Sequence, residues 1–125
     1  VKRMKKLLAM IIIAITLGAC SKSAGDNYVG SWQMDKNSTL GQNLQIMSKN
    51  ANQPLILPII TITKSGDLYL VKDGNDSILK MERFCPTGAT LKETKLVCNP
   101  EFELTFDATT GKLLTPTLGT FTKIN

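Results

Sequence analysis

The chain has 125 residues, a length typical of one domain. Its formal net charge is +5, but from Cys20 onward eleven Lys and Arg residues stand against ten Asp and Glu residues, which leaves +1. These charges are mixed in sign and form no basic block, which argues against a nucleic-acid-binding protein.

The first nineteen residues have the three parts of a secretory signal peptide. Four basic residues come first, an apolar run from Leu7 to Ala19 follows, and small residues end it. The thirteen residues of this run are too few to cross a bilayer, because a membrane-spanning helix needs about 20. We therefore expect residues 1–19 to be a signal peptide. A membrane-anchor helix and a buried core helix are the alternatives.

The leader ends in Leu17-Gly18-Ala19-Cys20, which resembles the lipobox of bacterial lipoproteins. In that family the cysteine sulfur receives a diacylglycerol, the chain is cut before the cysteine, and the new amino group is usually acylated. The resemblance implies that Cys20 is the lipidated residue, carrying palmitate-like chains. Two or three such chains make a stable membrane anchor, whereas one holds a protein only marginally. An ordinary buried or disulfide-bonded cysteine is the alternative for Cys20.

The lipobox resemblance also implies a location. Ser21 follows the cysteine, where an Asp would mark retention in the inner membrane, so sorting to the outer membrane is permitted. We expect a lipid-anchored protein of the cell envelope, held on the outer membrane and facing the periplasm or the cell surface. Residues 20–27 would be the lipidated cysteine and a short polar tether.

Residues 28–125 are predicted to form one β domain that starts with a strand and a short helix. In the first strand, alternation places Tyr28, Gly30, Trp32 and Met34 on one face. A short helix is expected over residues 38–50, where Leu40, Leu44 and Met47 have helical spacing and Ser38 or Thr39 is a candidate cap.

Short alternating runs separated by turn residues continue to the end of the chain. The remaining predicted strands are Ile59–Thr63, Leu68–Val71, Ile78–Cys85, Thr90–Cys98, Phe102–Phe106, Leu113–Thr115 and Leu118–Ile124. The turn Ser65-Gly66-Asp67 marks the clearest hairpin. About eight antiparallel strands result, and such sheets remove their exposed edges by closing on themselves.

Cys85 and Cys98 are the cysteines left once Cys20 is assigned to lipid. In an oxidising compartment such a pair favours a disulfide, which would stabilise a small domain by about 3 kcal/mol. A free thiol pair and a metal site are the alternatives. Twelve residues separate the two cysteines and the chain has no histidine, so a zinc site lacks ligands.

The Gly30-x-Trp32 pair on a first strand, followed by a helical segment and a meander, resembles the lipocalin-like pattern. The resemblance implies an all-β fold for residues 28–125: a small antiparallel up-and-down barrel of about eight strands with one short helix after the first strand. In that family the Trp closes one end of the barrel and a basic residue of the last strand packs over it. Gly30, Trp32 and Lys123 would then be structural residues. An ordinary core aromatic is the alternative for Trp32.

Catalysis is not expected, so we predict no catalytic residues, no metal and no cofactor. The chain has no histidine to act as a general base or metal ligand, and its cysteines have other assignments.

Two functions remain open at this point. The first is a lipid-anchored binding protein of lipocalin-like type that holds a small apolar ligand inside the barrel. Its predicted lining is Ile60, Ile62, Leu68, Leu70, Phe102, Leu104, Phe106 and Leu118. The second is a filled barrel that acts through its surface as an interaction, assembly or inhibitor protein of the envelope. The expected partners are the membrane and either an apolar ligand or an envelope protein.

Overall fold

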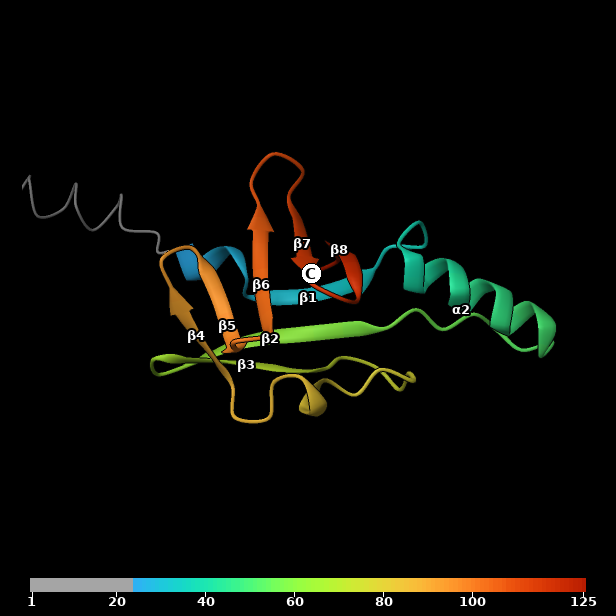
Figure 1. The fold of residues 1–125 in the computed structure, drawn as a ribbon, viewed down its shortest axis with the longest axis horizontal. Helices are drawn as coiled ribbons and strands as arrows, with labels where there is room; N and C mark the ends of the chain where they lie inside the picture. The colour runs from blue at the N-terminus through green and yellow to red at the C-terminus, as the bar shows by residue number, and fades with distance from the viewer. Residues whose placement is uncertain (1–23) are drawn as a thin grey trace, which may run out of the picture.

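The computed structural model describes residues 24–125 (Figure 1). The predicted signal peptide, Cys20 and residues 21–23 of the predicted tether lie outside the described residues, whereas residues 24–27 of that tether form a 3-10 turn. The elements, in chain order, are η1 (Ala24–Asn27), β1 (Gly30–Met34), α2 (Thr39–Asn50), β2 (Ile59–Ser65), β3 (Leu68–Asp73), η2 (Met81–Arg83), β4 (Ala89–Lys92), β5 (Lys95–Asn99), β6 (Phe102–Asp107), β7 (Lys112–Thr115) and β8 (Gly119–Lys123).

The eight strands form a closed antiparallel barrel in which each strand pairs with the next one along the chain. The barrel closes between β1 and β8, where Trp32 faces Lys123 and Met34 faces Phe121. A single α-helix follows the first strand. The predicted fold class is therefore confirmed.

The two ends of the barrel differ in how the strands are connected. At one end, here called the turn end, short turns join β2 to β3, β4 to β5 and β6 to β7, and η1 enters there. At the other, the helix end, α2 connects β1 to β2, and residues 74–88 with η2 connect β3 to β4. Figure 1 shows η1 and α2 on opposite sides of the barrel.

The helix begins where its sequence signals predicted. Ser38 is the N-cap, and its hydroxyl accepts a hydrogen bond from the Gly41 N–H at 3.1 Å. Leu44 is buried and Leu40 packs against the core. Met47, which has helical spacing with these two residues, is instead 56% exposed. The second half of α2 extends beyond the strands (Figure 1), so a side chain there has no barrel to pack against.

Two of the predicted strands are wrong. Residues 78–85 form no ladder, because the N–H groups of Phe84 and Cys85 donate to the Met81 carbonyl and make a 3-10 turn, η2. Residues 90–98 form two strands, β4 and β5, because Glu93 takes a left-handed conformation with φ of 58° and reverses the chain. The two errors cancel, so the count of eight strands still holds.

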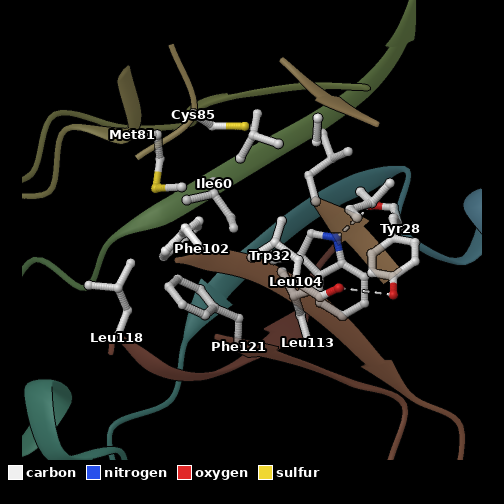
Figure 2. Packing of buried hydrophobic residues seen from close by; sticks show 14 of the residues in the cluster. Tyr28, Trp32, Ile60, Met81, Cys85, Phe102, Leu104, Leu113, Leu118 and Phe121 are labelled. Carbon is white, nitrogen blue, oxygen red and sulfur yellow. Dashed lines mark hydrogen bonds between the residues drawn. The ribbon is translucent and has the colours of Figure 1, made fainter. Parts of the chain in front are cut away.

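Buried apolar side chains from all parts of the barrel meet along its axis (Figure 2). On β2 these are Ile60 and Ile62, as predicted. On β3 the inner residues are Tyr69 and Val71, and the predicted inner residues Leu68 and Leu70 lie on the outer face. The register decides this, because Ile62 faces Val71 directly and such partners share a face of the sheet.

Candidate functional site

The predicted plug residues come together at the seam where the barrel closes. Trp32 is fully buried, and its indole N–H donates to the Tyr28 carbonyl at 2.9 Å (Figure 2). The Lys123 ammonium lies 5.7 Å from the centre of the Trp32 ring. Gly30 has a φ of 139°, and a Cβ there would collide with the Asn125 carbonyl oxygen and the Lys123 side chain. Glycine is thus required at the start of β1, where the end of the chain passes close beside it.

The phenol of Tyr28 joins the β4–β5 turn to β6, a role that the sequence analysis missed. Its oxygen lies 2.5 Å from the Thr94 carbonyl and 3.2 Å from the Leu104 carbonyl, and it accepts a hydrogen bond from the Phe106 N–H at 2.9 Å. Burial raises the pKa of Tyr28, and the hydrogen bond from Phe106 offsets part of that rise. The hydroxyl therefore stays protonated, and it holds the β4–β5 turn and β6 to the segment that precedes β1.

A carboxylate bonds strands β7 and β8 to the end of β1. Asp35, whose side chain is 15% exposed, accepts hydrogen bonds from the Lys112 ammonium at 2.8 Å and from the hydroxyls of Thr120 and Thr122 at 2.7 and 2.5 Å. Burial by itself raises the pKa of Asp35, but these donors outweigh burial and bring the pKa below its ordinary value. The sequence carried no signal for this cluster, because its members are far apart in the chain.

The structure supports the predicted pairing of Cys85 with Cys98. Their Cα atoms lie 4.9 Å apart, and the bond joins the end of η2 to β5 across 13 residues. The Asn99 side-chain amide donates to the Phe84 carbonyl at 2.9 Å beside it. Disulfide and amide together hold the long β3–β4 connection against the barrel.

The interior of the barrel is filled. Ile60, Ile62 and Leu104, three of the predicted ligand-lining residues, have no accessible surface, and the same holds for Trp32 and Phe121. A side chain bordering a void large enough for water would be accessible to it, so none of these five residues lines a water-sized cavity. Of the other predicted lining residues, Phe102 and Leu118 are buried in the same core and Phe106 is partly buried.

A groove of about 380 Å³ lies outside the barrel, at the helix end. Its walls are the second half of α2, residues 53–56 and residues 76–78. Three large apolar side chains in these walls face solvent: Met47, Ile56 and Ile78, which are 56%, 53% and 63% exposed. Sequence reasoning missed this groove, because its walls come from three separate segments and the segment at Ile78 was predicted to be a strand.

A second hollow, of about 420 Å³, lies between β3 and residues 82–88. Charged side chains of Lys72, Asp73 and Glu82 line much of it. Within residues 24–125 no group of three or more His, Cys, Asp or Glu side chains is arranged to hold a metal ion. No helix in the same residues is both long and apolar enough to span a membrane.

No protein-family model, no curated protein and no solved structure matches this chain. The candidate sites are therefore the filled barrel with its closing seam and the open apolar groove at the helix end.

Proposed function

We propose that this protein is a lipid-anchored component of the cell envelope that acts through its surface, with the barrel as a rigid scaffold. The observation that carries the proposal is the filled interior. Trp32, Ile60 and Leu104 have no accessible surface, and they occupy the space where a carrier would hold its ligand. Of the two functions considered, the surface-acting barrel therefore has the better support.

A carrier function would require the core to open. Ligand pockets have volumes of about 300–1,000 Å³. Making that space here would require separating close-packed apolar side chains, and creating such cavities costs several kcal/mol of folding free energy. The apolar area that faces solvent lies outside, in the groove beside α2.

The envelope location rests on the sequence of the leader and on the cysteines. Cys20 ends a signal-peptide pattern, and only three residues separate it from Ala24, where η1 begins. The Cys85–Cys98 disulfide agrees with an oxidising compartment outside the cytoplasm. We assign the protein no catalytic role, no cofactor and no nucleic-acid partner.

Native mass spectrometry of the protein purified from membranes tests the filled barrel. The expected mass is that of the processed chain plus its covalent acyl groups, with no further lipid. Adding fatty acids or phospholipids should leave the melting temperature unchanged. A stoichiometric, non-covalently bound lipid together with a raised melting temperature would contradict the proposal and favour a carrier.

The anchor has a separate test. Metabolic labelling with palmitate should label the wild-type chain and not Cys20→Ala, whose precursor should stay uncleaved. Normal processing of Cys20→Ala would contradict the assignment of Cys20.

A further inference from the structure

The groove at the helix end lies where the β2–β3 hairpin separates. The ladder runs from Ser65 opposite Leu68 to Ile60 opposite Asp73. One more backbone bond follows, from the Gly74 N–H to the Ile59 carbonyl at 2.6 Å. In the described part of the chain, no backbone bond joins the two segments beyond this point. If the same register continued, Leu55 would face Ile78, but the ladder ends before it reaches that pair.

The side chain of Asn75 holds the two segments together where they separate. Its oxygen accepts a hydrogen bond from the Ile59 N–H at 2.9 Å, and its amide donates to the Leu57 carbonyl at 2.9 Å. One side chain thus makes the two hydrogen bonds that a paired strand would have made. Because it ties residues 57–59 in place, the separation is a built feature of the fold.

The segment before β2 has an unpaired backbone. Leu55 is half-buried, Ile56 is exposed and Leu57 is buried, which is the alternation of a strand. Among residues 24–125, no hydrogen bond involves the N–H or carbonyl groups of Leu55 and Ile56. Unpaired strand edges are templates for an added strand.

The side chains around this edge are apolar. Met47, Ile56 and Ile78 surround it, and Asp76 is the one charged residue in the lining. The Asp76 carboxylate is fully exposed, and its contact with Lys80 is long, at 3.7 Å. An exposed pair of this kind contributes little, so the lining favours an uncharged or basic ligand over an acidic one.

We propose that the groove binds an extended apolar segment of another envelope protein, which adds as a strand beside residues 55–57. This inference rests on the proposed surface-acting function. Alternate side chains of the bound segment would pack on Met47 and Ile78, while its backbone would pair with the N–H and carbonyl of Leu55. In an extended chain these groups point to the same edge as those of Leu57 and Ile59, toward residues 74–78. An acyl chain would fill the same space but leave those N–H and carbonyl groups without partners, at a cost in binding free energy.

The position of the groove fits a protein partner. The four residue-to-residue steps from Cys20 to Ala24 span at most about 14 Å. The lipid anchor therefore holds the turn end of the barrel, where η1 enters, beside the bilayer. The seven residues of β2 alone span about 23 Å, and the groove lies beyond their far end. The groove thus opens on the side of the barrel away from the membrane.

Selection from random ten-residue peptides displayed on phage tests the proposal, with the full chain held in phospholipid nanodiscs. We expect enriched peptides that are apolar and lack acids. They should bind Ile78→Asp at least about tenfold more weakly than the wild type, a change of about 1.4 kcal/mol. Ile56→Asp is a second groove variant. Ile124→Asp is the matched control, because Ile124 is 50% exposed at the turn end, and it should bind like the wild type.

The backbone pairing has its own readout. Peptide binding should slow hydrogen exchange at the amide of Leu55, and N-methylation of the alternate peptide residues that face it should abolish binding. Failure to enrich any peptide, equal binding to Ile78→Asp, or equal binding of the methylated peptides would each overturn the proposal. Displacement of the peptides by palmitate, or self-association that Ile78→Asp abolishes, would also overturn it in favour of an acyl ligand or a second copy.

These outcomes differ from failure of the surface-acting function. A lipid retained inside the barrel by both the wild type and Ile78→Asp would contradict the filled scaffold. Loss of peptide selection, with no lipid bound to the barrel in native mass spectra, would contradict the groove proposal alone.

Discussion

The Lys123 ammonium lies 5.7 Å from the centre of the Trp32 ring, and the two residues face each other in the β1–β8 register that closes the barrel. The first and last strands are therefore joined by a side-chain contact as well as by the backbone ladder. A cation over an indole is worth about 0.5–1 kcal/mol at an exposed site. The Lys123 side chain thus lies over the buried ring at the seam.

Replacing Lys123 should weaken this seam. We expect Lys123→Ala to lower the free energy of unfolding by about 1 kcal/mol, because the cation–π contact and the cover over Trp32 are both lost. Lys123→Arg should retain most of the stability. Urea unfolding followed by the fluorescence of the single tryptophan measures the effect. Lys92→Ala, on an exposed position of β4, is the control and should change little.

Removing the Tyr28 hydroxyl should have a larger effect. Tyr28→Phe leaves the Phe106 N–H without its acceptor, and the carbonyls of Thr94 and Leu104 lose a donor. The loss of about 2–3 kcal/mol expected for such unsatisfied groups should appear in urea or thermal unfolding. Tyr69→Phe is a matched control, because Tyr69 is buried to a similar extent. Equal stability of Tyr28→Phe and the wild type would rule out a structural role for the hydroxyl.

The raised pKa of Tyr28 also predicts an alkaline dependence. Because burial favours the neutral phenol in the folded state, its contribution is complete below the unfolded pKa of about 10. It should be lost as the pH rises from there through the higher folded pKa. The free energy of unfolding should be measured from pH 8 upward for the wild type and for Tyr28→Phe. The difference between the two isolates the contribution of the Tyr28 phenol.

Asp35 predicts a loss of stability at low pH, whereas Tyr28 predicts one at high pH. Burial raises the pKa of Asp35, but the hydrogen bonds from Lys112 and from the two threonines outweigh it, so the folded pKa lies below the unfolded one. The stabilisation is therefore present above pH about 4 and lost as the pH falls through the folded pKa. Asp35→Asn should destabilise the protein by about 1–3 kcal/mol at pH 7 and by much less at pH 2. The same destabilisation at both pH values would show that the charge is not involved.

Reduction of the disulfide should act mainly on one part of the molecule. Opening the Cys85–Cys98 bond should lower the free energy of unfolding by about 3 kcal/mol, through the entropy returned to the unfolded chain. Because the bond ties the β3–β4 connection to β5, hydrogen exchange should speed up first at residues 79–88. The double variant Cys85→Ser, Cys98→Ser should behave like the reduced wild type. A thiol assay on the denatured, unreduced protein should detect no free thiol from these two residues.

Local sequence signals predicted those parts of the fold that depend on neighbours in the chain. Alternation identified Trp32 and Met34 as the inner face of β1, and Ser65-Gly66-Asp67 marked the β2–β3 turn. Ser38 marked the start of α2. Each of these signals depends on side-chain direction or turn chemistry within a few residues, so it can be read before any tertiary contact is known.

Other features depended on contacts between distant residues. Residues 68–71 are apolar on both faces, so only the pairing of Ile62 with Val71 decides that Leu68 and Leu70 point outward. The turn at Glu93 contains neither glycine nor proline, so no turn residue marks it. The groove could not be predicted from local sequence, because its walls come from three separate segments: α2, residues 53–56 and residues 76–78.

The sequence by itself therefore determined an alternating β domain and its cysteine pair, and it predicts a lipoprotein leader for residues outside those that the structure describes. Only the tertiary structure decided that the barrel interior is filled and that the exposed apolar surface lies beside α2. The physical reason is that close packing and strand register are properties of many residues at once. No single stretch of chain shows whether its apolar side chains will meet others or remain in solvent.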